Sequence, residues 1–338
     1  MVNYYSSEIM VRNKGVAYYG VFSPSKAIID YRNMLDHGVN LILYEVSEFD
    51  FYFWRNGLIK IIEKAKEMGF RICLSPWGWG GIFGEGPPSL YLHKHSEGRQ
   101  VSAVRGKKLN VACFNCEEFK NYIVTCIERL SEESEADCFL WQEPGYRVLD
   151  DDWSCRCECC RNAFRSKYGY EMPDRLTSDV VEFREKMLVK FIRDISRAVK
   201  VADSKKKVAL CLPPRLSIKL GVRSWNKVLE IKELDVLGVS LYRKYVSKEE
   251  EFKWLKDSAK LLASAIRAKG KESIALIQGF NIPKGHEEDV IKTIKLLSEA
   301  DFTSIVLWPY RAGENSLLES GDPEKLWNLI GKIYREIK

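Results

Sequence analysis

The chain has 338 residues, of which 46% are hydrophobic and 30% charged, as expected of a soluble globular protein with a large core. Its 53 basic and 47 acidic residues give a net charge of +6 and are interspersed, so the composition gives no signal of a nucleic-acid partner. No apolar run approaches the roughly 18 residues of a membrane span, and the amino-terminal stretch lacks the apolar segment of a signal peptide. We therefore expect a cytoplasmic protein with no membrane partner, and leave open whether it forms a homo-oligomer.

Short apolar runs alternate with helix-period segments along the whole chain. The apolar runs predict strands at 15–22, 40–44, 70–74, 137–141, 208–212, 236–241, 273–278 and 304–308. The amphipathic segments predict helices at 57–66, 118–131, 177–203, 249–269, 286–299 and 323–337. Continuous apolar strands that alternate with helices indicate a parallel sheet covered by helices. Eight such repeats predict an α/β fold of the closed (β/α)8 TIM barrel type. An open doubly wound sheet is the alternative, although the turn after the first run has no glycine-rich phosphate fingerprint.

The longest connections follow the third and fourth predicted strands, at 75–110 and 142–173. In a barrel both leave from the carboxyl-terminal face, where active sites are built. Since no linker rich in Pro, Gly or Ser divides the chain, we expect one domain over 1–338. A cysteine-rich insertion at about 144–173 belongs to it.

Four thiols lie within six positions of this insertion, in the segment that contains Cys155, Cys157, Cys159 and Cys160. A tight C-x-C-x-x-C run suits one tetrahedral zinc ion, with a fourth ligand from Cys113 or Cys116. Adjacent Cys159 and Cys160 do not easily serve one ion together. A disulfide or free thiols are the alternatives. The remaining cysteines, which are Cys73, Cys126, Cys138 and Cys211, are expected to be small buried apolar residues.

The fourth predicted strand ends abruptly in an amide and a carboxylate, Gln142 and Glu143. In a barrel both project into the central mouth. A carboxylate walled there by Trp141 and Tyr146 would have a raised pKa and would serve as a general acid. Gln142 is placed to bond a substrate hydroxyl, and the alternative for Glu143 is a helix cap or a surface position.

Aromatic residues gather at the same strand ends: Trp77 and Trp79 after the third, Tyr242 after the sixth, and Trp308 and Tyr310 at the eighth. Sugar rings present apolar C–H faces, so aromatic platforms beside carboxylates and amides suit a carbohydrate. Each ring taken alone is more often part of a core.

At these positions the chain resembles the family 42 glycoside hydrolases, β-galactosidases of the large clan built on (β/α)8 barrels. Cys113-Phe-Asn is similar to the stretch that carries the family's first metal cysteine. Glu143 ends a segment similar to the strand-four motif Asn-Glu, whose Glu is the acid/base. Cys155, Cys157 and Cys160 are similar to the run that supplies three further zinc ligands. The resemblance therefore implies a structural zinc on four thiolates, which leave no open position for substrate.

The chain also departs from the family. Gln142 stands where the family has Asn, and the seventh strand ends in Ile277 and Gln278, where the clan has its nucleophilic Glu. By contrast, Trp308 with Arg311 does resemble the family's closing strand-eight motif. The likeness covers the catalytic barrel alone, and it implies a barrel and a zinc site more firmly than β-galactosidase activity.

A glycosidase normally needs two carboxyl groups. Candidates for the second are Glu45, Glu48 and Asp50 after strand two and Glu314 after strand eight, and Glu45 is preferred because it directly follows the apolar run. Direct attack by water with inversion and substrate-assisted attack both remain open.

These observations predict a glycoside hydrolase acting on a β-linked sugar, with Glu143 and Glu45 as catalytic residues. The residues expected to contact substrate are Gln142, Trp77, Trp79, Tyr242, Gln278, Trp308 and Arg311. The alternatives are a carbohydrate-binding barrel that has lost catalysis and a zinc-stabilised protein of other function. Lys- and Glu-rich helices are typical of thermophiles, whose cytosol tolerates disulfides, so a bridge that involves Cys116 or Cys159 stays open.

Overall fold

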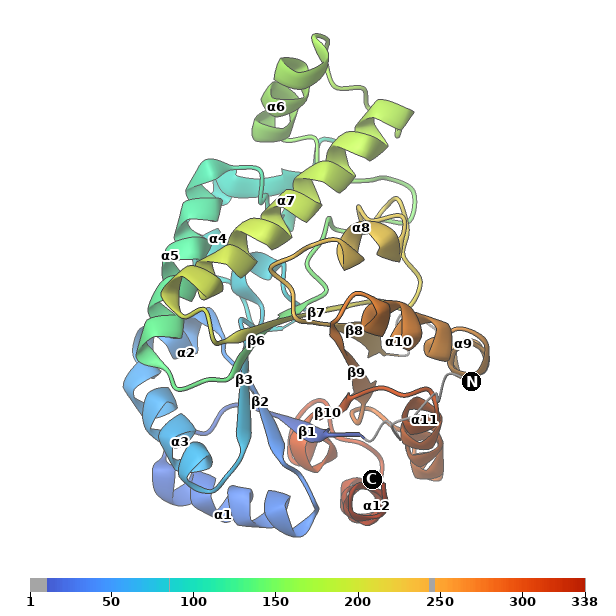
Figure 1. The fold of residues 1–338 in the computed structure, drawn as a ribbon. Helices are drawn as coiled ribbons and strands as arrows, with labels where there is room; N and C mark the ends of the chain where they lie inside the picture. Colours follow the sequence, from blue (N-terminus) through green and yellow to red (C-terminus); the bar gives the residue numbers. More distant parts are fainter. Residues whose placement is uncertain (1–10, 85, 243–246, 338) are drawn as a thin grey trace, which may run out of the picture.

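The computed structural model describes residues 11–84, 86–242 and 247–337, and its centre is a closed barrel of eight parallel strands (Figure 1). The strands are β1 (Asn13–Tyr18), β2 (Leu41–Glu45), β3 (Arg71–Ser75), β6 (Cys138–Gln142), β7 (Lys207–Leu212), β8 (Val236–Leu241), β9 (Glu272–Gln278) and β10 (Ser304–Trp308). The first strand pairs with both the second and the last, which closes the sheet. The predicted (β/α)8 barrel is therefore confirmed, and the open sheet is excluded.

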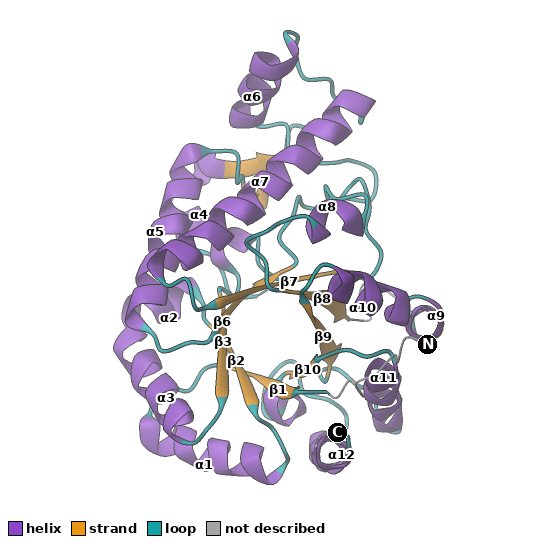
Figure 2. Cartoon of the chain, viewed as in Figure 1, coloured by secondary structure: helices purple, strands orange, loops and turns teal. Residues whose placement is uncertain are grey.

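Helices surround the barrel as an outer layer (Figure 2). They are α1 (Pro24–Asp36), α2 (Glu48–Phe53), α3 (Arg55–Glu67), α5 (Glu117–Glu133), α7 (Ser178–Ala202), α8 (Trp225–Leu229), α9 (Lys248–Asp257), α10 (Ala259–Ala268), α11 (Glu287–Glu299) and α12 (Pro323–Glu336). The helix predicted at 249–269 is two helices, because the backbone at Ser258 (φ −125°, ψ −27°) departs from helical geometry. The first strand ends before position 22, since the chain turns at Gly20 with φ +76°.

Two insertions rise from the carboxyl-terminal face and pack against each other. The insertion after β3 contains α4 (Leu90–Lys94) and the antiparallel hairpin of β4 (Arg99–Val101) and β5 (Lys108–Ala112). The insertion after β6 contains α6 (Glu158–Tyr168), which lies beyond the barrel near the far end of α7 (Figure 1). A bridge between Ser102 and Ser154 and a hydrogen bond from Ala103 N to Trp153 O (2.8 Å) join the two insertions.

Arg184 of α7 holds the insertion after β6 in place. Its side chain is fully buried and donates to the backbone carbonyls of Ser154 (2.8 Å), Lys219 (2.7 Å) and Ile218. Its guanidinium lies 4.2 Å from the ring centroid of Tyr146. Since a guanidinium has five N–H donors and no acceptor, three carbonyls and an aromatic face satisfy it without a carboxylate.

Inward-facing side chains fill the interior of the barrel. Small and branched residues form these inner layers, among them Ala17, Leu43, Leu140, Ala209, Leu276 and Val306. The cysteines Cys73 and Cys211 belong to them as well, as small buried residues. A barrel packed in this way is not a pore, so a ligand can enter only from its ends.

Within the described ranges, no helix is both long enough and apolar enough to cross a membrane. The amino-terminal stretch on which the signal-peptide prediction rests falls largely outside the described residues, at positions 1–10.

Candidate active site and metal centre

Six of the eight barrel strands end in a polar or aromatic residue, and all but Tyr18 of β1, which packs against Tyr31 of α1, belong to the candidate site. Glu45 is the last residue of β2, Ser75 of β3, Gln142 of β6, Gln278 of β9 and Trp308 of β10. Because the carboxyl ends of all strands in a parallel barrel open on one face, these side chains gather in one mouth.

Glu45 is at the centre of a hydrogen-bond network in this mouth. Its Oε1 accepts hydrogen bonds from Trp308 Nε1 (2.7 Å) and from Gln142 Nε2. The amide of Gln142 also donates to Ser75 Oγ at 3.2 Å. The side chain of Glu45 is 3% exposed, and its Oε2 is buried without a hydrogen-bond partner among the described residues. One carboxylate oxygen is therefore held in place, and the other is buried with its hydrogen-bonding capacity unused among the described residues.

Burial raises the pKa of Glu45 from its ordinary value of 4.5 to about 7. The donors Trp308, Gln142 and Ser75 favour the charged form and lower this pKa, whereas the nearby charge of Glu143 raises it further. The net result is a carboxyl group that exchanges its proton close to neutral pH. That is the range in which a general acid or base is most effective.

Glu143 follows the end of β6 directly and is 9% exposed. Its backbone has φ +50°, a left-handed conformation that is uncommon for residues other than glycine. Its N–H donates to Cys211 O of β7 at 2.8 Å, so the turn is tied to the neighbouring strand. Glu143 lines a cavity of about 180 Å³ together with Gly84, Tyr146, Arg147 and other residues. The acid therefore faces a recess between the two insertions.

Aromatic rings wall the mouth around Trp308. The ring of Trp308 lies with its centroid 5.7 Å from Tyr19, 5.7 Å from Trp77, 5.2 Å from Phe280 and 6.5 Å from Tyr242. Trp77, Tyr242 and Trp308 were expected here from the sequence. Tyr19 and Phe280 were missed, although each follows the end of a barrel strand by one or two residues, which is the signal that would have identified them.

Two tryptophans do not take the predicted positions. Trp79 is fully buried, and its indole N–H donates to Val46 O at 2.7 Å, so it has no face open to a sugar. Trp141 is also fully buried and donates to Ser196 Oγ of α7 at 2.9 Å, so it does not wall Glu143. In a strand, neighbouring side chains point to opposite faces. Since Gln142 points into the mouth, Trp141 must point to the outer layer.

The other candidates for a second carboxylate have structural contacts. Glu48 accepts hydrogen bonds from Gly80 N (2.7 Å), Ser89 Oγ (2.8 Å) and Tyr91 N (2.7 Å), and so holds the insertion after β3 in place. Asp50 caps α2 by accepting from Ser47 N at 2.8 Å.

Glu314 follows β10 and Gln278 ends β9, and both have partners of their own. Glu314 forms an ion pair with Arg311 at 2.8 Å, and Gln278 donates to Phe280 O at 2.8 Å. Of the four candidate acids, Glu45 alone ends a barrel strand.

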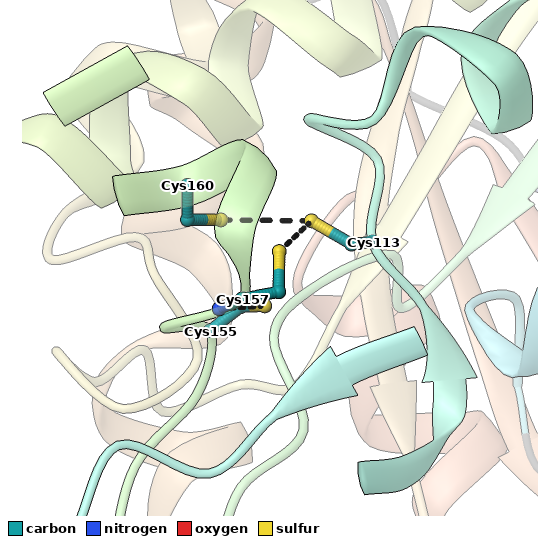
Figure 3. A group of neighbouring side chains, drawn as sticks. All are labelled: Cys113, Cys155, Cys157 and Cys160. Atoms are coloured by element: carbon teal, nitrogen blue, oxygen red, sulfur yellow. Dashed lines mark hydrogen bonds between the residues drawn. The ribbon is translucent and has the colours of Figure 1, made fainter. Parts of the chain in front are cut away.

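The four cysteines expected to bind metal lie together between the two insertions (Figure 3). Cys113 Sγ is 3.5 Å from Cys160 Sγ and 3.4 Å from Cys157 Sγ, and the sulfur atoms of these three and Cys155 all lie within 4.8 Å of one another. A tetrahedral zinc site with Zn–S bonds of 2.3 Å has sulfur atoms about 3.8 Å apart. The four thiols are buried, and their spacing fits such an ion.

Amide donors surround these sulfur atoms. Val101 N (3.3 Å) and Cys157 N (3.4 Å) donate to Cys155 Sγ, and Asn115 Nδ2 donates to Cys160 Sγ at 3.1 Å. Such donors stabilise thiolates, the form in which cysteine binds metal. The donor set therefore also suits a thiolate-bound cation.

The two remaining cysteines of this region form a disulfide. Cys116, at the start of α5, is bonded to Cys159 of α6, with the Cα atoms 5.4 Å apart. This bond joins the two insertions and accounts for the thiol next to Cys160 that the metal site does not need.

No protein-family model and no curated protein sequence matches the chain. Solved structures do match its barrel. The β-galactosidase from the Antarctic haloarchaeon Halorubrum lacusprofundi superposes with a TM-score of 0.70 at 15% identity, over 96% of this chain and 58% of that one. The cold-adapted β-galactosidase from Rahnella sp. R3 gives 0.71 at 12% identity, over 98% and 57%. The endo-β-1,4-mannanase from Thermotoga petrophila gives 0.61 at 15% identity, over 98% and 77%.

These similarities confirm the resemblance of the barrel to β-galactosidases as a likeness of fold. The fold is one that glycoside hydrolases use. The chain spans less than two thirds of the length of either β-galactosidase. Sequence identity of 12–15% carries no statement about activity, which has to be argued from the site itself.

Proposed function

We propose that this protein is a glycoside hydrolase that cleaves a β-linked sugar, with Glu143 as general acid and Glu45 as the second carboxyl group. The observation that supports this proposal is that Glu45, in the aromatic mouth, lies close enough to Glu143 for the charge of Glu143 to raise its pKa. An aromatic wall beside two carboxyl groups is the arrangement that binds a sugar ring and breaks its glycosidic bond.

In the proposed reaction, Glu143 gives its proton to the glycosidic oxygen as the bond to the anomeric carbon breaks. Glu45, held by Trp308 and Gln142, takes a proton from the water that attacks this carbon. The end of β9 offers Gln278 instead of a carboxylate, so the proposal assigns no covalent nucleophile there. Direct attack by water predicts inversion at the anomeric carbon.

The test is hydrolysis of aryl β-glycosides with leaving groups of different acidity. Glu143→Gln should lower the rate about 10²- to 10⁴-fold for a poor leaving group such as a methoxyphenol, which needs the proton. The loss should be much smaller for dinitrophenol, which leaves without it. Glu67→Gln, at an exposed acid of α3, is the matched control. Full hydrolysis of the poor substrate by Glu143→Gln would disprove the role of Glu143, and NMR of the first-formed anomer tests inversion.

A carbohydrate-binding barrel without catalysis is the second candidate. The observation that favours it is Gln278, whose amide donates to Phe280 O in the place where the resemblance implies a nucleophile. Calorimetry that detects tight oligosaccharide binding without turnover would support this function. Robust turnover of any glycoside, abolished by Glu143→Gln, would exclude it.

We also propose that Cys113, Cys155, Cys157 and Cys160 hold a structural zinc ion. A bound ion would join the two insertions that border the recess of Glu143. Four thiolates leave no position for substrate, so the ion would take no part in the reaction. Metal analysis of the purified protein should find zinc without an exchangeable water ligand. An open coordination position would favour a zinc-dependent function instead.

Arg311 as a substrate contact, the cytoplasmic location and the thermophilic source remain predictions. The Lys- and Glu-rich helices and a disulfide beside free thiols support the last two together, since thermophile cytosols tolerate disulfides.

A further inference from the structure

Six of the ten cysteines lie where the two insertions meet, and they form two overlapping groups. The first group is Cys113, Cys155, Cys157 and Cys160, and the second is Cys116, Cys157 and Cys159. Within each group, every sulfur atom lies within 4.8 Å of every other. Cys157 belongs to both groups. A thiolate has more than one lone pair, so Cys157 can bridge two cations.

The second group differs from the first in its access to solvent. Cys116 and Cys157 are buried, whereas Cys159 is half-buried. Two helices also begin at this group, since Cys116 is the N-cap of α5 and Cys157 is the N-cap of α6. Helix N-termini stabilise thiolates through their unpaired N–H groups and dipoles. The group therefore combines three convergent sulfur atoms with partial exposure of Cys159 to solvent.

We propose that the reduced protein binds a second zinc ion on Cys116, Cys157 and Cys159, with Cys157 as a thiolate bridge to the ion of the four-cysteine site. Three protein ligands leave the fourth tetrahedral position to a water molecule on the exposed side. The Cys116–Cys159 disulfide is then the oxidised form of this site, because the same two sulfur atoms bind either each other or the ion. The inference rests on the proposed four-cysteine zinc site.

A phosphine is a suitable reductant for converting the Cys116–Cys159 disulfide into two thiols. The phosphine attacks one sulfur, the S–S bond breaks, and the other sulfur leaves as a thiolate. Water then releases the first sulfur and the phosphine becomes its oxide, which leaves two thiols. When zinc binds, Cys116 and Cys159 release their two protons.

The test is the zinc content of the full-length protein, equilibrated with zinc and separated from free metal, with and without a phosphine. We expect one ion per chain in the oxidised protein and two in the reduced protein. The variant Cys116→Ser/Cys159→Ser should bind one ion under both conditions. Cys126→Ser, which removes a thiol elsewhere on α5, should behave like the parent protein. One ion in the reduced parent, or two in the double variant, would overturn the inference.

Alkylation of the unmutated protein keeps the test valid should the double variant fail to fold. After reduction and zinc loading, mass spectrometry should find Cys116 and Cys159 protected from iodoacetamide to the same extent as Cys113. Rapid alkylation of Cys116 and Cys159 beside a protected Cys113 would refute the second site alone. Zero ions in both redox states would instead refute the four-cysteine site on which it rests.

Discussion

The raised pKa of Glu45 predicts a specific pH dependence of stability, which Glu45→Gln should remove. The folded chain holds the proton of Glu45 up to a pH of about 7, whereas an unperturbed Glu loses it at 4.5. Below pH 4.5 both states are protonated, and Glu45 adds no pH dependence. As the pH rises through 4.5 the unfolded chain ionises first, so the free energy of unfolding falls until the folded chain ionises as well, at about pH 7.

The magnitude follows from the size of the shift. One pKa unit is worth about 1.4 kcal/mol, so forcing the buried carboxyl to ionise costs the folded protein about 3.4 kcal/mol well above pH 7. About 2.5 kcal/mol of this loss falls between pH 5 and pH 8.5. Glu45→Gln has no proton to lose in this range. Its amide gains a buried N–H₂ at the position of Oε2, which adds a constant cost that cancels when two pH values are compared.

The assay is urea unfolding of the parent protein and the variant at a series of pH values. The stability of Glu45→Gln relative to the parent should rise by about 2.5 kcal/mol from pH 5 to pH 8.5. Glu67→Gln, at an exposed acid, gives the baseline for losing one carboxylate from the surface. A difference that stays constant within about 0.5 kcal/mol across this range would refute the assignment of Glu45 as a buried acid with a raised pKa.

Three further perturbations test other parts of the site. Trp308→Phe keeps a ring in the mouth but removes the N–H that Glu45 accepts at 2.7 Å. Urea unfolding should show a free energy of unfolding that is about 2 kcal/mol lower at pH 8 and less affected at pH 5, where Glu45 is protonated. An equal loss at both pH values would contradict a hydrogen bond from Trp308 to the charged Glu45. Arg184→Met leaves three backbone carbonyls without their donor, so it should lower the free energy of unfolding by about 3 kcal/mol and speed proteolysis within 144–173. Arg193→Met, on the exposed face of α7, is the control and should have little effect. Chelation should lower stability by about 2.7 kcal/mol relative to protein in zinc at 100 times Kd, and an unchanged thermal midpoint would exclude a structural ion.

The eight barrel strands were predictable because each is a continuous apolar run between polar loops. The position of Glu45 in the mouth was predictable for the same reason, since it is the first charged residue after its run. Alternation along β6 was also readable: once Gln142 faces the mouth, Trp141 has to face the helices. The sequence therefore contained enough information to place Trp141 in the core.

The position of Trp79 was not predictable from local sequence. It lies in a glycine-rich loop whose path depends on Glu48, which binds Gly80, Ser89 and Tyr91 across 32 to 43 positions of the chain. The pairing of Cys116 with Cys159 is a similar case, because two insertions have to meet before these thiols do. Contacts between the insertions are set by tertiary packing, and neither hydrophobic periodicity nor residue spacing within either segment predicts them.

The backbone conformation of Glu143 makes its chemistry separable from its role in the fold. At φ +50°, glycine and asparagine fit as well as or better than glutamate, while β-branched residues are disfavoured. Under the proposed function, a single change to Asn or Gly would thus remove the proton donor without disturbing the turn between the strand and the recess. The proposed hydrolase and the proposed carbohydrate-binding barrel therefore differ at this position by a substitution that the backbone accommodates.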